Sequence, residues 1–195
     1  MRAPLRWLSW IAVAAVVLCP ALAGAQDRVG GGGWGGYESP LGHVRAYSGV
    51  TGGFAPGQIN MYGLGGVFEP KAVIWDFIVL GARIDGAALL GVDAQSVSQA
   101  QLALRIVGAA MLKAELLLFP GEIRPFIGLG VGWYAAVMVA GGAGGTNSFS
   151  GTGPGGMPQI GVDLGWFRAA AQYHFMLGEL GAANYLSVEL AWRVY

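Results

Sequence analysis

Glycine alternates with large apolar residues along residues 124–139, RPFIGLGVGWYAAVMV. In a helix, where each residue advances about 100°, Gly128, Gly130 and Gly132 would fall on different faces. In a strand the period is two, so these glycines line one face and the large residues between them line the other. The pattern therefore predicts a strand with one apolar face and one nearly bare face.

The rest of the chain contains similar apolar or alternating segments, separated by turn residues. Strands are expected at residues 43–50, 57–68, 72–90, 101–119, 124–139, 157–165, 167–177 and 185–195. Eight is an even number and the minimum for a closed transmembrane β-barrel. The sequence thus predicts an all-β fold, an up-and-down antiparallel transmembrane β-barrel of about eight strands at residues 43–195.

The expected connections alternate between tight and long. Tight turns are expected at residues 69–71, 120–122 and 165–166, and longer loops at 91–100, 140–156 and 178–184, with an intermediate link at 51–56. Short turns at one end and long loops at the other are typical of outer-membrane barrels. By composition, residues 140–156 predict a flexible loop, which either reaches outside the cell or is a passive spacer.

Aromatic residues cluster near the expected tight turns, which predicts an aromatic girdle at the inner membrane interface. These residues are Phe68, Trp75, Phe77, Phe119, Phe126, Trp166, Phe167, Trp192 and Tyr195.

Polar and apolar side chains also alternate on the later strands. At residues 185–195, the apolar residues from Leu186 to Val194 would face lipid, while Ser187, Glu189 and Arg193 would face the interior of the barrel, its lumen. A lipid-facing charge costs about 2–4 kcal/mol near the bilayer midplane, so charges are expected inside. Asp76 breaks this alternation in the third strand, and a bulge or a place at the headgroup level would have to accommodate it.

The inward charges form the candidate site. The expected lumen ion network contains Arg45, Arg83, Asp85, Arg105, Lys113, Glu115, Asp163, Arg168, Glu189 and Arg193. These ions either neutralise one another and plug the barrel or line a narrow polar path for a small solute. Gly128, Gly130 and Gly132 would form a lumen wall that makes room for arginine and tyrosine side chains from other strands.

The N-terminal residues 1–25 resemble a cleaved signal peptide. Arg2 and Arg6 precede an apolar core at residues 8–18, and small residues follow it. An uncleaved anchor helix, or a lipoprotein modified at Cys19, is the alternative. Cleavage would leave a Gly-rich segment at residues 26–42 and no cysteine, hence no disulfide, thiol catalysis or cysteine metal site.

Composition and charge limit the kinds of molecule that the protein is expected to bind. The formal charge is zero and only 11% of residues are charged, against roughly 25% in soluble domains. Without a basic cluster, no nucleic-acid partner is expected.

The sequence contains little that supports a catalytic site or a metal site. The histidines, His43 and His174, are expected near opposite rims, so neither a metal site nor a cofactor is predicted. Ser187 is the inward hydroxyl that a lipid-modifying hydrolase could use beside His174, but no serine lies near His174 along its own strand. We therefore expect no enzyme.

The segments RPFIGLGVGWY, YHFMLG and NYLSVELAWRVY resemble the small bacterial outer-membrane β-barrel families, the relatives of outer-membrane protein A, OmpX and OmpW. The resemblance implies an integral protein of a Gram-negative outer membrane, which contacts lipid and the barrel-insertion machinery. The terminal aromatic Tyr195 matches the insertion signal of these families, although Arg193 and Ala191 depart from the apolar pattern before it. A monomer is expected.

The expected role is envelope integrity or surface interaction, with a plugged lumen. The alternatives are a porin-like transporter of small apolar or amphipathic solutes and, third, the lipid-modifying hydrolase. A rival fold, a helical inner-membrane protein, stays open because residues 125–145 are uncharged and long enough to span a bilayer as a helix.

Overall fold

The computed structural model describes residues 44–57, 59–75, 77–93, 101–119, 121–142 and 145–194. The predicted signal peptide, the Gly-rich segment at 26–42, His43 and Tyr195 lie outside the described residues, as do the side chains of residues 75, 93 and 101.

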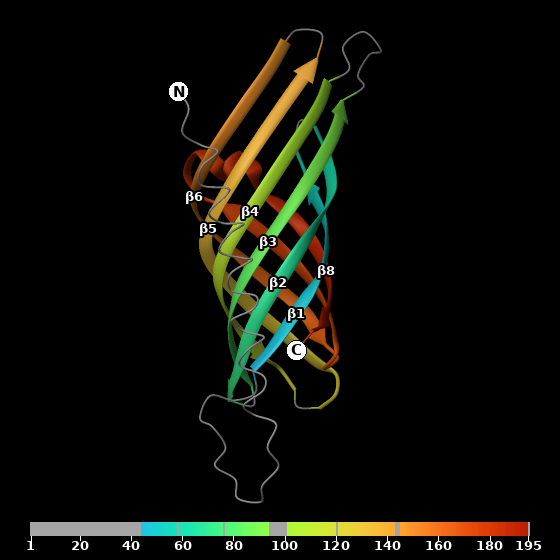
Figure 1. The fold of residues 1–195 in the computed structure, drawn as a ribbon, viewed down its shortest axis with the longest axis vertical. Helices are drawn as coiled ribbons and strands as arrows, with labels where there is room; N and C mark the ends of the chain where they lie inside the picture. The colour runs from blue at the N-terminus through green and yellow to red at the C-terminus, as the bar shows by residue number, and fades with distance from the viewer. Residues whose placement is uncertain are drawn as a thin grey trace, which may run out of the picture. The chain divides into compact units, whose positions relative to one another are not determined.

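Eight antiparallel strands form a closed barrel, in which each strand pairs with the next and β8 pairs with β1 (Figure 1). The strands are β1 (Val44–Ala55), β2 (Met61–Trp75), β3 (Ile78–Asp93), β4 (Gln101–Leu117), β5 (Arg124–Gly142), β6 (Gly145–Asp163), β7 (Phe167–Met176) and β8 (Tyr185–Arg193). A short 3-10 helix, η2 (Gly178–Ala183), connects β7 to β8. The predicted all-β up-and-down barrel is confirmed, and the helical rival is wrong because residues 124–142 form β5.

The barrel has two different ends. We call the end with the connections at residues 76–77, 118–123 and 164–166 the turn end, and the end with those at 56–60, 94–100, 143–144 and 177–184 the loop end. Within the described residues, no helix is both long and apolar enough to cross a bilayer.

Residues 69–71 lie inside β2, so the predicted tight turn there is wrong. Pro70 pairs with Ala46 of β1, whereas the β2–β3 ladder skips Glu69 and Pro70. Proline has no N–H to donate, and the sheet accommodates it where one ladder is interrupted. The turn instead follows at residues 76–77, where Asp76, which broke the predicted alternation, lies outside the described residues.

The predicted long loop at residues 140–156 is also wrong. β5 and β6 pair continuously from Arg124↔Asp163 to Gly142↔Gly145, which leaves only residues 143–144 as a connection. The glycine-rich composition hides this strand, because glycine disfavours strands on its own. Hydrogen bonds to β5 stabilise this strand although its own sequence disfavours it.

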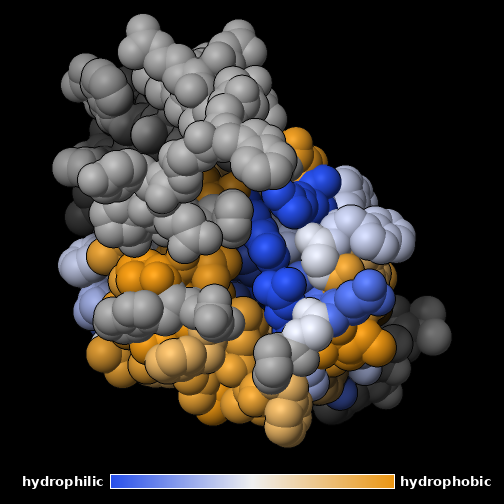
Figure 2. All heavy atoms as spheres, turned by 90° about the horizontal axis from the view of Figure 1, so that it is seen from below, coloured by the Kyte–Doolittle hydropathy of each residue, from blue (hydrophilic) through white to orange (hydrophobic). Residues whose placement is uncertain are grey.

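The predicted alternation across the barrel wall is confirmed on β8. Leu186, Val188 and Leu190 are 46%, 58% and 44% exposed, while Ser187 and Glu189 are 4% and 1% exposed. Seen from the turn end, hydrophilic residues form a band in the middle of the view, with hydrophobic residues on either side of it (Figure 2). The apolar outer surface is the one that a hydrocarbon environment requires.

The aromatic girdle is confirmed in part. Phe77, Phe119, Trp166 and Trp192 are exposed near the turn end. Phe126 is instead completely buried in the lumen, where the Arg168 guanidinium lies 3.9 Å from its ring centroid. Its position on β5 has the parity of Gly128, which already indicated the inner face.

The glycine face of β5 faces the lumen. A Cβ at Gly128 would meet the Gln159 side chain, and one at Gly130 would lie 3.4 Å from atoms of both Met111 and Met157. The space over these glycines therefore holds glutamine and methionine from the neighbouring strands, not the arginines and tyrosines expected.

Adding a methyl group at Gly132 is expected to destabilise the barrel. The Cβ of Gly132→Ala would collide with the Ala110 carbonyl oxygen of β4, and relieving the collision should lower the unfolding free energy by about 1–3 kcal/mol. Urea unfolding in micelles, followed by tryptophan fluorescence, measures this cost. The matched control is Gly52→Ala, where the Cβ meets nothing within 4 Å, with an expected change below about 1 kcal/mol. Equal costs at both positions would contradict the packing argument.

Candidate functional site

Nine ionisable side chains form one buried network in the half of the lumen nearest the turn end. Each is at most 7% exposed. β2, β3 and β4 each contribute two residues separated by one, which share a face because the strand period is two. The members are Glu69 and Lys71, Arg83 and Asp85, Lys113 and Glu115, and the single residues Asp163, Arg168 and Glu189.

Arg83 connects acids from three strands. Its Nε donates to Asp85 Oδ2 at 2.7 Å, and its Nη1 donates to Glu189 across the lumen and to Glu69 Oε2 of β2 at 3.4 Å. Nη2 donates to Gln172 Oε1 at 2.9 Å. Planar guanidinium groups suit such forked contacts because their donors have fixed directions.

Arg168 binds Glu115 with both terminal nitrogens. Nη1 donates to Glu115 Oε2 at 3.0 Å, and Nη2 donates to Oε1. Gln159 Nε2 donates to the same carboxylate at 2.8 Å, and Arg168 Nε lies 3.2 Å from Glu189 Oε1. Arg168 is completely buried. It is therefore the link between the acids of β4 and β8.

Two lysines complete the network. Lys113 Nζ donates to Glu69 and lies 2.8 Å from Glu115 Oε1. Lys71 Nζ lies 3.4 Å from Glu115 Oε2 and 3.5 Å from Asp163 Oδ2. The network thus extends from β2 to the end of β6 at the turn end.

Four cations face five carboxylates, joined by eleven ion pairs. Removing ions from water is costly unless partners replace the water, and most of the charged atoms here have such partners. Glu69 Oε1, Asp85 Oδ1, Arg168 Nε and Glu189 Oε1 are buried without a hydrogen bond, and all of these except Asp85 Oδ1 take part in one of the ion pairs. In the described part of the chain, no three His, Cys, Asp or Glu residues are arranged to hold a metal ion. The arrangement joins charges from six strands inside the lumen by ion pairs.

The structure brings together seven of the ten predicted network residues. These are Arg83, Asp85, Lys113, Glu115, Asp163, Arg168 and Glu189. Arg45 is only half-buried, and Arg193 is exposed at the end of β8. Arg105 is buried but separate from the network.

Glu69 and Lys71 were missed because a proline between two charged residues reads as a turn. Val67 has the same parity and is buried, so the alternation does continue through Pro70. The charge–x–charge spacing that recurs on the next two strands was the available signal.

The half of the lumen nearest the loop end is mainly apolar. Four methionines, Met61, Met111, Met157 and Met176, are buried there in one cluster together with Leu180 of η2. Other members of the cluster include Ala55, Ala87, Leu89, Val107, Tyr134 and Tyr185. This apolar cluster lies on the loop-end side of the ion network and includes Leu180 of η2.

Arg105 is a charged residue that lies in this apolar half. It is 7% exposed, and its Nη2 donates to the Ala182 carbonyl at 3.1 Å and contacts Met138 Sδ at 3.7 Å. Its Nε and Nη1 are buried without a hydrogen-bond partner. A guanidinium with two unused donors is suited to an anionic group.

His174 was expected near a rim of the barrel, but it lies inside the lumen. Its Nε2 is 3.0 Å from Ser187 Oγ on the neighbouring strand, and its Nδ1 is 3.4 Å from the Tyr134 hydroxyl. Ser187 was the inward hydroxyl singled out on the next strand, and β7 and β8 place the two residues side by side. Both side chains are at most 4% exposed, so they face neither lipid nor water.

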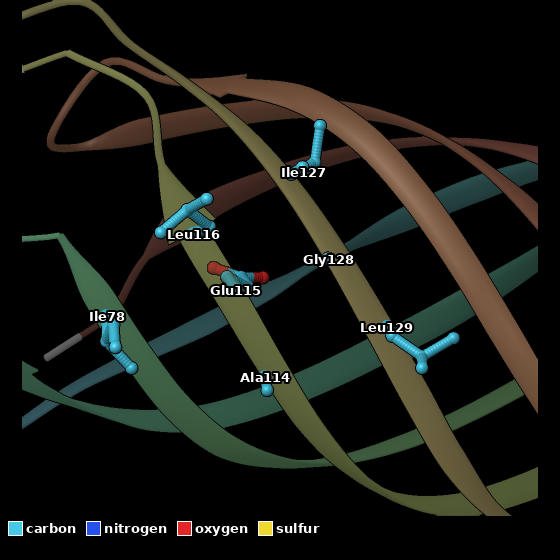
Figure 3. A pocket seen from close by; sticks show the side chains of 7 residues that line it. All are labelled: Ile78, Ala114, Glu115, Leu116, Ile127, Gly128 and Leu129. Carbon is cyan, nitrogen blue, oxygen red and sulfur yellow. The ribbon is translucent and has the colours of Figure 1, made fainter.

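The outer wall carries a shallow apolar groove of about 400 Å³ on β3, β4 and β5. Figure 3 shows Leu116, Ile127 and Leu129 around Ala114, whose small side chain leaves the depression. Glu115 and Gly128 also line the groove, but the Glu115 side chain is buried in the ion network. The outward lining is apolar, so the groove fits an acyl chain.

Solved structures share this fold. Ail, the attachment invasion locus protein of Yersinia pestis, superposes with a TM-score of 0.53 at 12% identity, covering 78% of this chain and 99% of Ail. Neisserial surface protein A gives 0.43 at 13% identity over 77% of this chain and 94% of its own. The N-terminal barrel of Pseudomonas aeruginosa OprF gives 0.38 at 10% identity over 78% and 98%. No protein-family model and no curated protein matches the chain. At these identities the likeness to Ail concerns the fold, which is that of small eight-stranded outer-membrane β-barrels.

Proposed function

We propose that this chain is an integral outer-membrane protein of a Gram-negative bacterium, whose barrel is a sealed scaffold for envelope integrity or surface interaction. It would be exported by a signal peptide at residues 1–25, cleaved, and inserted as a monomer by the barrel-insertion machinery, with Tyr195 as the signal. The observation that carries the proposal is the ion network, which fills the lumen with paired charges.

The outer surface supports the membrane location. Leu64 is 75% exposed, Leu112 71% and Ile160 61%, on three different strands. A water-soluble monomer rarely exposes so much contiguous apolar surface. Because β1 pairs with β8, the sheet has no free edge at the level of the ion network and needs no second copy to close it.

A sealed lumen predicts an absence of conductance. We expect the refolded, signal-processed protein to give no stepwise current in planar bilayers at neutral pH, because ions would have to break the buried pairs to pass. The variant Arg168→Ala removes the link between β4 and β8 and should raise the current above that of the wild type if it inserts. Regular conductance steps from the wild-type protein would contradict the sealed scaffold.

A second candidate function is transport of small apolar or amphipathic solutes, and it has its own observation. The β6–β7 ladder skips Met157 and Pro158, and Met157 belongs to the apolar cluster with the other buried methionines. Proline has no N–H to donate, so the wall loses ladder hydrogen bonds there. Solute-dependent uptake without ionic current would favour this function over the scaffold.

A lipid-modifying hydrolase receives less support. Ser187 and His174 are in contact, but Ser187 Oγ also donates to Gln172 Oε1 at 3.1 Å and the pair is enclosed by the wall. A nucleophile must reach its substrate to act, and this serine faces the lumen interior.

A further inference from the structure

The β5–β6 hairpin extends beyond its neighbour β7. β6 pairs with β5 up to Gly145, but its ladder with β7 begins only at Gly155↔Met176. Residues 145–154 therefore have β5 on one side and, among the described residues, no strand on the other. The open edge is roughly 30 Å long at the usual rise per residue of a strand. Figure 1 shows this part of the hairpin rising beyond β7 and β8 at the loop end.

The hydrogen-bonding groups of this edge can be assigned. The Leu177 amide donates to the Pro154 carbonyl at 3.0 Å, so the backbone of Pro154 faces the side of β7. Backbone groups alternate between the two neighbours of a strand. The N–H and C=O groups of Thr146, Ser148, Ser150 and Thr152 therefore point to the open side.

The edge lacks the usual protection against pairing. Strand edges are commonly blunted by lysine, by other charges or by bulges. Here no charged residue lies between Arg124 and Asp163, and the β5–β6 register has no shift. Pro154 blocks pairing only at the end of the edge nearest β7, where the Leu177 amide already donates to its carbonyl.

The two faces of the edge differ. The side chains of Thr146, Ser148, Ser150 and Thr152 are exposed, which gives the outer face a row of small hydroxyl groups. On the inner face Phe149 packs against the apolar cluster, and Leu180 lies over Gly151 and Gly153. A strand added here would meet hydroxyl groups on one face and apolar side chains on the other.

A cleft of about 290 Å³ marks the lower end of the edge. It is lined by residues 151–154 of β6 and by Leu177, Gly178, Glu179 and Leu180. Gly178 has a φ of +68°, which turns the chain away from β6 after Leu177 and opens the cleft. Glu179 is exposed and is the charged residue of the cleft lining.

We propose that the β6 edge at residues 145–153 binds an extended peptide segment of a surface partner by strand addition. The segment would alternate apolar with small polar residues and carry a basic residue opposite Glu179. Main-chain hydrogen bonds would hold it, as in other cases of strand addition. The proposal deepens the surface-interaction role and rests on it for the location of the edge outside the membrane.

A second copy in the same membrane fits the edge less well. Two upright barrels related by an axis along the membrane normal would both run β6 from the outside of the cell toward the membrane. With strands tilted by about 35–45°, the two edges would cross instead of running side by side. An extended segment from another molecule has no such constraint.

The test is residue-resolved amide exchange by NMR on the full mature protein in detergent micelles. The probe is a nine-residue peptide that alternates threonine and valine and ends in lysine. In the free protein, the amides of Thr146, Ser148, Ser150 and Thr152 should exchange fast, while those of Asn147 and Phe149, bonded to β5, stay slow. With saturating peptide, the first set should slow by about tenfold or more. The fully N-methylated peptide is the matched control and should have no effect.

Two variants localise the effect. Ser150→Pro removes an edge donor and should abolish the peptide-induced slowing, whereas Ser150→Ala keeps the N–H and should retain it. Slow exchange of the first set in the free protein, no slowing with peptide, or equal slowing in both variants would overturn the proposal. Slowing that grows with protein concentration alone would assign the edge to a second copy and overturn it too. Because the measurement needs no bilayer, its outcome is separate from that of the conductance test.

Discussion

Replacing Arg168 by leucine is expected to lower the unfolding free energy of the barrel by about 3–5 kcal/mol. Arg168 binds both oxygens of Glu115 and contacts Glu189, and it is completely buried. Without it, two carboxylates stay in the lumen with fewer cations, and water cannot easily reach them. Urea unfolding in lipid vesicles, followed by tryptophan fluorescence, measures the loss.

Arg124→Leu is the control for this loss. Arg124 lies at the turn end, and its Nε donates to the Gly121 carbonyl, not to a buried acid. Surface contacts of this kind contribute about 1 kcal/mol or less, so a small change is expected. If Arg168→Leu does not refold, its band on unboiled gels should migrate as the unfolded form while that of Arg124→Leu keeps the folded position. An Arg168 variant as stable as Arg124→Leu would show that the network contributes little.

An arginine at position 188 should also cost about 2–4 kcal/mol in a bilayer. Val188 is 58% exposed on the outer wall near the middle of β8, where hydrocarbon would surround it. A charge there must either lose its hydration or distort the membrane. The measurement is the same urea titration in vesicles.

The cost should depend on depth. Val194 is similarly exposed but follows the last residue of β8 at the turn end, so Val194→Arg should cost no more than about 1 kcal/mol. Equal penalties at residues 188 and 194 would mean that the outer wall does not face a bilayer. The pair thus tests the membrane location independently of conductance.

The fold could be predicted because one physical constraint acts on every strand. Facing hydrocarbon on one side and a lumen on the other imposes a period of two, which is visible at Ile127 to Trp133 and again at Leu186 to Trp192. The failures occur where local chemistry and pairing disagree. Pro70 and the glycines of residues 140–156 are turn formers, yet β1 and β5 hold them in strands.

The sequence allowed us to predict which side chains of the site face the lumen, but not which of them form ion pairs with one another. Parity indicated that Arg83, Lys113 and Glu115 point inward, and they do. It could not distinguish the paired Arg168 from the isolated Arg105, because pairing depends on the stagger between strands that lie far apart in sequence. Parity also indicated Ser187 as an inward hydroxyl on the strand next to His174, and the two side chains are in contact.

The seam between β1 and β8 has a consequence for the order of assembly. It joins Tyr47 to Arg193, nearly the whole length of the barrel sequence, while β5 and β6 meet through a two-residue connection. Short connections close quickly and distant ends close late, so the seam should be the last step of folding. Until the seam forms, the charged residues of β2, β3 and β4 lack their ion pairs with Arg168 and Glu189. The complete network therefore stabilises only the closed barrel.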